Sequence, residues 1–161
     1  MAMNINPNNM SSSAEVKTYK HFKDLKGHVD KAVDKLKNID NDDKVDLSPA
    51  KGNVAIENFK VFDTNVRATG ALTYDPQSGE VKKLDLDTKD TAEYMATSDT
   101  VKTHISYADD GNTQVYDFQK HDHVHDHLSE LTDNTKFHWK YTVDKKTGVI
   151  TAEENLPYDS K

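Results

Sequence analysis

The sequence contains no cysteine, and it has only six glycines and four prolines among its 161 residues. Without thiols the chain can form no disulfide bond, no thiolate metal site and no cysteine nucleophile. It also lacks any apolar run close to the roughly 20 residues that a membrane-spanning helix needs. Residues 1–13 have neither the basic nor the apolar part of a secretory signal. A cytoplasmic location and export after trimming of a precursor both remain open.

Large apolar residues are scarce. Leu, Ile, Val and Phe supply 32 of the 161 residues, about 20%, which is at the lower limit for a globular chain. Their spacing is regular, so we expect a folded domain with a thin core. The length suits a single domain, which we place at residues 14–161. Residues 1–13 are polar and rich in Asn and Ser, and we expect them to form a disordered tail.

The net charge of −7 is unevenly distributed along the chain. Residues 14–38 contain seven lysines against four acidic residues, a net charge of +3, and the rest of the chain therefore carries −10. An acidic chain of this kind disfavours non-specific binding to nucleic acid or to an anionic membrane. The simplest expectation is a basic helix beside an acidic sheet rim, and the alternative is a helix that detaches to meet an acidic partner.

One long helix is predicted at residues 14–39, with Ser13 as its N-cap. Apolar residues recur there at steps of three and four, the period of an amphipathic helix, and no proline interrupts the run. The stripe consists of Phe22, Leu25, Val29, Ala32, Leu36 and Ile39. A helix this long cannot bury such a stripe alone, so we expect the strand-like remainder of the chain to cover it.

After an acidic linker at residues 40–53, the segment 54–155 reads as a series of short strands. Apolar and polar residues alternate over 66–74, 101–107 and 137–143, the pattern of a half-buried strand. The segments 75–79 and 144–148 each begin with Asp and end with Gly, as tight hairpin turns do. A phase slip near Asn58 indicates a β-bulge.

These elements predict an α+β fold in which the long N-terminal amphipathic helix packs on a largely antiparallel, meander-type sheet of about six or seven strands. In general architecture this arrangement resembles the cystatin-like and NTF2-like folds. An enzyme of NTF2-like build would need polar residues lining a pocket between helix and sheet. The positions predicted to face inward, among them the face shared by Phe137, Trp139 and Tyr141, are nearly all apolar.

One stretch carries a hint of chemistry, because His121, His123, His125 and His127 fall within seven residues. On a strand their four imidazoles would project from one face at steps of about 7 Å. On a helix they would form two i, i+4 pairs, the spacing used to chelate one ion. Imidazole is a good ligand for zinc, nickel or copper, and Asp122 and Asp126 are candidates to orient the rings or to ligate directly.

The histidine cluster has two other interpretations. Val124, Leu128 and Leu131 follow an i, i+4, i+7 spacing, so residues 122–131 are a candidate short surface helix with solvated histidines. Clustered histidines also gain charge together near pH 6.5, which makes a pH-sensing role a further hypothesis.

Signatures of catalysis are missing from the sequence. It has no nucleophile elbow, no phosphate-cradling glycine-rich loop and no His-Glu-x-x-His motif, and acidic residues such as Glu154 are interpreted as solvated. We therefore expect a non-enzymatic binding or structural module, of bacterial or phage type, that meets a protein partner or a second copy of itself through its sheet face or edge. The alternative hypothesis is a transition-metal-binding protein that uses the cluster at 121–127.

Overall fold

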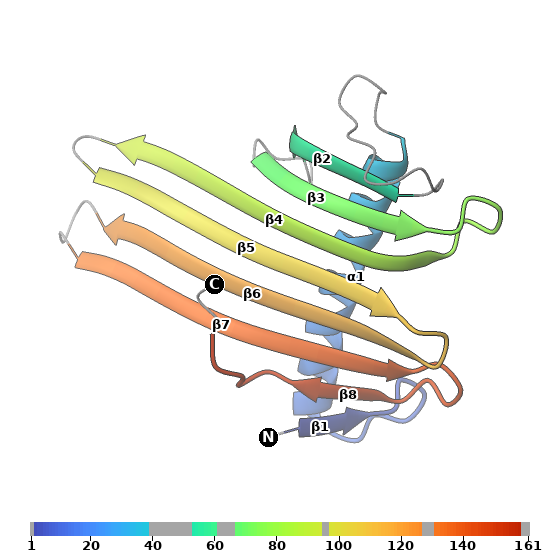
Figure 1. The fold of residues 1–161 in the computed structure, drawn as a ribbon. Helices are drawn as coiled ribbons and strands as arrows, with labels where there is room; N and C mark the ends of the chain where they lie inside the picture. The colour runs from blue at the N-terminus through green and yellow to red at the C-terminus, as the bar shows by residue number, and fades with distance from the viewer. Residues whose placement is uncertain (1, 39–52, 61–66, 95–96, 127–130, 159–161) are drawn as a thin grey trace.

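The computed structural model describes residues 2–38, 53–60, 67–94, 97–126 and 131–158. Their order confirms the α+β fold, with one helix packed across one face of an antiparallel meander (Figure 1). The sheet has eight strands in the order β1-β8-β7-β6-β5-β4-β3-β2. The elements are β1 (Ala2–Ile5), α1 (Ser13–Lys37), β2 (Asn53–Lys60), β3 (Arg67–Tyr74), β4 (Val81–Tyr94), β5 (Thr97–Asp109), β6 (Thr113–Asp126), β7 (Leu131–Asp144) and β8 (Ile150–Glu153). The predicted linker at 40–53 lies outside the described residues except for Asn53, which opens β2.

Helix α1 begins one residue earlier than the sequence predicted. Ser12, not Ser13, is the N-cap, and its hydroxyl accepts a hydrogen bond of 3.1 Å from the backbone N–H of Glu15. The helix ends at Lys37, whose ammonium donates to the carbonyl of Gly79 at 2.7 Å and thereby ties the helix end to the β3–β4 turn. The predicted stripe is confirmed from Phe22 to Leu36, while Ile39 lies outside the described residues.

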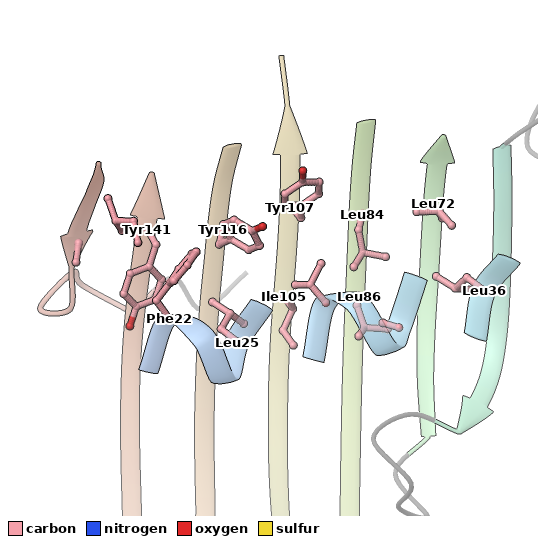
Figure 2. Close-up of a cluster of buried hydrophobic side chains, with 14 of the residues drawn as sticks. Phe22, Leu25, Leu36, Leu72, Leu84, Leu86, Ile105, Tyr107, Tyr116 and Tyr141 are labelled. Carbon is pink, nitrogen blue, oxygen red and sulfur yellow. The ribbon is translucent and has the colours of Figure 1, made fainter. Parts of the chain in front are cut away.

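The core lies between this stripe and the inner face of the sheet, the face that meets α1. Strand register places apolar residues of β4, β5, β6 and β7 in two rows across the sheet. One row is Leu84, Tyr107, Tyr116 and Tyr141, and the next is Leu86, Ile105, Phe118 and Trp139. Figure 2 shows Phe22 and Leu25 of the helix among these side chains. Burying each large apolar side chain contributes on the order of 1.5–3 kcal/mol.

The predicted disordered tail is corrected by the structure. Residues Ala2–Ile5 form β1, which pairs antiparallel with β8 and makes the eighth strand, one more than the predicted maximum. Ile5 lies opposite Ile150 and has no exposed surface. A four-residue strand with one buried apolar residue is too short to show a period, so only its partner β8 gives it this role.

The predicted turn chemistry is confirmed. Gly79 and Gly148 both have φ of 78°, a backbone conformation that glycine adopts without steric cost. Asp75 and Asp144 begin these turns, and each carboxylate accepts a hydrogen bond of 2.8 Å from the backbone N–H two residues on. The predicted bulge near Asn58 is also present, as a register shift between β2 and β3.

Strands β4–β7 are much longer than the width of the helix that crosses them, so part of each strand extends past the helix. The candidate site lies on this extended part. Strands β4, β6 and β7 have 14 residues and β5 has 13, which corresponds to about 45 Å at the rise of a strand. Figure 1 shows α1 crossing these four strands near one end only. The halves of β4–β7 that lead toward residues 95–96 and 127–130 project past the helix.

Candidate binding surface on the outer face of the sheet

The histidine cluster begins on a strand. Strand β6 runs through Asp126 and β7 starts at Leu131, so the prediction of a surface helix at residues 122–131 was wrong. His121, His123 and His125 therefore occupy alternate positions of β6, as the strand alternative expected. The side chains of His123, His125 and Asp126 and the whole of His127 lie outside the described residues.

Residues adjacent on a strand face opposite sides of the sheet, and this separates Asp122 from His121. Asp122 shares the inner face with Lys120, whose ammonium lies 3.5 Å from the Asp122 carboxylate. His121 lies on the outer face, which we define as the face opposite α1. In the part of the chain that the structure describes, no group of three or more His, Asp or Glu side chains is arranged to hold a metal ion.

On the outer face His121 belongs to a basic row formed by Lys89, Lys102, His121 and Lys136. Register places Lys89 directly opposite Lys102, Lys102 opposite His121, and His121 opposite Lys136. The three lysines are exposed and His121 is half-buried. Four neighbouring strands at 4.7–4.9 Å spacing make this row about 14 Å long. The row crosses the projecting halves of β4–β7, beyond the helix.

Such a row is unfavourable for stability. Like charges directly opposite one another on neighbouring strands destabilise a sheet, and Lys89 and Lys102 form such a pair in a chain whose net charge is −7. Among the ion pairs formed by the described residues, none includes Lys89 or Lys102. The row thus places three lysines and a histidine side by side on an acidic protein.

A pocket of about 240 Å³ opens over the row. Among the described residues, Lys89, Thr100, Lys102 and His121 line it. Two ammonium groups, a hydroxyl and an imidazole all offer hydrogen-bond donors, and none of the four residues carries a negative charge. Chemically, the lining suits a carboxylate or another oxyanion.

The segment that follows β8 forms one margin of this surface. The ring of His138 on β7 lies 2.9 Å from both Asp117 and the carbonyl of Pro157, so each ring nitrogen faces an acceptor. This contact brings Tyr158 beside the row. The ring of Tyr158 lies 5.7 Å from that of His121, and the Lys136 ammonium lies 5.6 Å from its centroid, which is cation–π distance.

The next row of the outer face, nearer the helix, contains acidic groups that are paired with histidines. Within this row, His104 lies 2.7 Å from Asp87. His138 belongs to the same row and lies 2.9 Å from Asp117, which is in the following row. These contacts place the two carboxylates beside imidazole rings.

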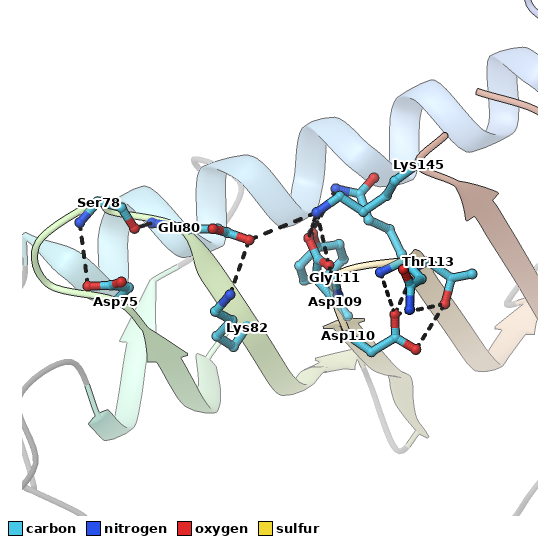
Figure 3. A network of polar contacts seen from close by, with 12 residues as sticks. Asp75, Ser78, Glu80, Lys82, Asp109, Asp110, Gly111, Thr113 and Lys145 are labelled. Atoms are coloured by element: carbon cyan, nitrogen blue, oxygen red, sulfur yellow. Dashed lines mark hydrogen bonds and ion pairs between the residues drawn. The ribbon is translucent and has the colours of Figure 1, made fainter. Parts of the chain in front are cut away.

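Two polar networks lie on the other side of the sheet. In the first, shown in Figure 3, the buried carboxylate of Asp109 meets the ammonium of Lys145 at 3.0 Å and the backbone N–H of Gly111 at 2.8 Å. Burial raises the pKa of Tyr107 to about 12, and its neutral phenol donates to the same carboxylate at 3.5 Å. These donors occupy both oxygens of the Asp109 carboxylate. The network therefore connects the β5–β6 turn to the β7–β8 turn.

The second network joins the helix to the C-terminal segment. Glu154 accepts from the phenol of Tyr141 at 2.5 Å and lies 3.0 Å from His21, whose ring stacks on Trp139 at 4.7 Å. Burial and the contact with Glu154 raise the pKa of Tyr141. Glu154 is half-buried, so its interpretation as a solvated residue was wrong. The sequence contains no local signal for this contact, since 133 positions separate His21 from Glu154.

Comparison with known proteins gives no family. No family model, no curated protein and no solved structure matches the chain. Within the described residues, no helix has both the length and the apolar character that crossing a membrane requires.

Proposed function

We propose that the chain is a non-enzymatic binding module that holds a protein partner on the outer face of its sheet. The observation that carries this proposal is the asymmetry of the two faces. Helix α1 covers the inner face of β4–β7 near one end, whereas the outer face of the same strands carries charged and polar side chains in register. An antiparallel sheet buried on one side commonly leaves its other side in water, and here that side projects past the helix.

The packing of the inner face supports binding rather than catalysis. Leu84, Leu86 and Ile105 are at most 1% exposed against the helix, so apolar side chains fill the positions where an NTF2-like enzyme would place polar ones. The outer face, in contrast, lies on a continuous hydrogen-bonded sheet. Such a rigid surface can meet a partner with little loss of conformational entropy on binding.

Site-specific photo-crosslinking in the source cells tests the proposal. A benzophenone amino acid at Ser106, on the outer face, is expected to give discrete adducts with a partner, which mass spectrometry then identifies. The matched control places the same amino acid at Lys17, an exposed residue of α1. Adducts from Lys17 and none from Ser106 would contradict the proposal and favour contact through the helix. An adduct of twice the chain's mass would identify a second copy as the partner.

A transition-metal-binding protein is the second candidate function. Its supporting observation is that β6 continues through Asp126 and so places His121, His123 and His125 at alternate strand positions. Side chains at such positions lie about 7 Å apart along one face, a span that two imidazoles with Zn–N bonds of about 2.0–2.1 Å can bridge. Zinc, nickel or copper are the ions that suit these ligands, with His127 and Asp126 as further candidates.

A further inference from the structure

We propose that the basic row Lys89, Lys102, His121 and Lys136 binds an acidic peptide segment of the protein partner, with one carboxylate seated in the pocket between Lys89 and Lys102. This inference rests on the proposed function and names the chemistry of its partner. The pocket, the row and the neighbouring Tyr158 ring together make a surface with a defined position and direction.

The pocket fits a carboxylate side chain. Directly opposed residues on neighbouring strands have Cβ atoms about 4.5–5.5 Å apart, so the ammonium groups of Lys89 and Lys102 can both reach one carboxylate placed between them. Charge-assisted hydrogen bonds of about 2.7–2.9 Å would then form to both oxygens. Thr100 and His121 also line the pocket. A volume of 240 Å³ is below the roughly 300–1,000 Å³ of drug-sized ligand pockets and matches a side chain.

The length of the row favours a peptide over a single small anion. Lys136 lies two strands away from Lys102, with His121 between them, so an isolated oxyanion in the pocket would leave Lys136 unused. A segment with several carboxylates can occupy the pocket and also reach Lys136. The Tyr158 ring beside Lys136 offers an apolar face for the aliphatic part of such a segment.

The surroundings of the row disfavour a nucleic acid. Asp87 and Asp117 lie on the same outer face, and the chain is acidic as a whole. Binding of a long polyanion depends on a broad positive surface that releases many counterions. A row about 14 Å long with Asp87 and Asp117 on its helix side instead suits a short acidic segment.

The facing lysines of the row support a role in recognising an acidic partner. The opposed pair Lys89 and Lys102 repels within the free protein, and an anion seated between the two ammonium groups converts this repulsion into attraction. Complementary charge of this kind increases the rate of encounter and selects the partner. Binding should therefore weaken strongly as salt is added.

Fluorescence anisotropy with a labelled oligoglutamate peptide tests the inference on the full chain. We expect saturable binding that weakens roughly tenfold in the double variant Lys89→Gln/Lys102→Gln. It should be lost in about 1 M salt, where the Debye length is about 3 Å. The matched control, Lys17→Gln/Lys20→Gln, removes the same charge from the exposed side of α1 and should leave binding unchanged. Urea denaturation should show that the Lys89/Lys102 variant is at least as stable as the parent chain, because it removes a like-charge pair.

Any of the following results would overturn the inference. Equal loss of binding in the two double variants would mean non-specific attraction, and unchanged binding in Lys89→Gln/Lys102→Gln would place the peptide elsewhere. Tighter binding of inorganic phosphate or of a single-stranded oligonucleotide than of the peptide would assign the row to that ligand. If the peptide does not bind but Ser106 still crosslinks a partner, the acidic segment is wrong and the proposed function stands. If both experiments fail, both proposals fail.

Discussion

The carboxylate of Asp109 and the ammonium of Lys145 lie 3.0 Å apart, and this ion pair joins the end of β5 to the turn between β7 and β8. The backbone N–H of Lys145 also donates to the carbonyl of Asn112 at 3.0 Å. Two hairpin turns far apart in sequence are therefore held together at the end of the sheet that α1 covers.

This pair predicts a pH-dependent contribution to stability. Burial works to raise the pKa of Asp109, but hydrogen bonds from the Gly111 amide and the Lys145 ammonium outweigh it, and the pKa is lowered. A lowered folded-state pKa means that the contribution is complete above the ordinary carboxyl value of about 3.9 and is lost as the pH falls through the folded-state pKa. Asp109→Asn should therefore unfold at lower urea near neutral pH, and this difference should shrink below about pH 4.

Equilibrium urea denaturation across this pH range measures the effect. Asp24→Asn, which changes an exposed carboxylate of α1, serves as the control and should show little difference at any pH. A stability difference between the parent chain and Asp109→Asn that does not vary with pH would show that the carboxylate's charge is unimportant.

The helix stripe makes a second prediction. Leu36 has no exposed surface and Leu25 is 3% exposed. Replacing either with Ala should lower the free energy of unfolding by roughly 2–5 kcal/mol, as for other buried large-to-small changes. Val16 is 53% exposed, and Val16→Ala should stay within about 0.5 kcal/mol. Chemical denaturation checks both values, and a small effect of Leu36→Ala would indicate a helix that is not docked.

Strand β1 makes the third prediction. Ile5 is fully buried against Ile150, so deleting residues 1–6 should lower the melting temperature. Ile5→Ala alone should cost roughly 2–5 kcal/mol. Asn8→Ala changes an exposed side chain just after the strand and provides the control. An unchanged melting temperature after the deletion would restore the expectation of a tail that contributes nothing.

The metal hypothesis makes the fourth prediction. If the histidine cluster is a functional site, zinc or nickel should bind the chain at micromolar or tighter affinity and raise its melting temperature, because a ligand of the native state stabilises it by mass action. The affinity should fall as the pH drops through about 6.5, where imidazoles become protonated. Titration calorimetry on metal-stripped protein measures the affinity, and thermal unfolding measures the stabilisation.

The variant His121→Ala/His125→Ala should abolish this binding, whereas His28→Ala, which changes an exposed residue of α1, should not. Tight binding without thermal stabilisation would indicate chelation by an unstructured arrangement of ligands. No binding at a metal concentration well above micromolar would end the hypothesis.

Local sequence patterns specify the helix and most strands of this fold. The period of three and four residues from Phe22 to Leu36 specifies a helix with one buried stripe, and alternation specifies strands such as β3 and β7. Gly79 and Gly148, each four residues after the Asp that begins its turn, specify where two hairpins reverse. These signals lie within a few residues of the structure that they produce, so the α+β fold could be read from them.

Strand register and packing, in contrast, determine which residues far apart in the sequence lie side by side. Lys89, Lys102, His121 and Lys136 lie on four strands. The three lysines look like ordinary polar residues in their own segments, and His121 stands out there only as part of the histidine cluster. A shift of one residue in any pairing would move a strand's whole set of side chains to the other face, so the basic row exists only in the register observed. The same holds for Ile5 in β1, because its burial depends on a partner strand at the other end of the chain.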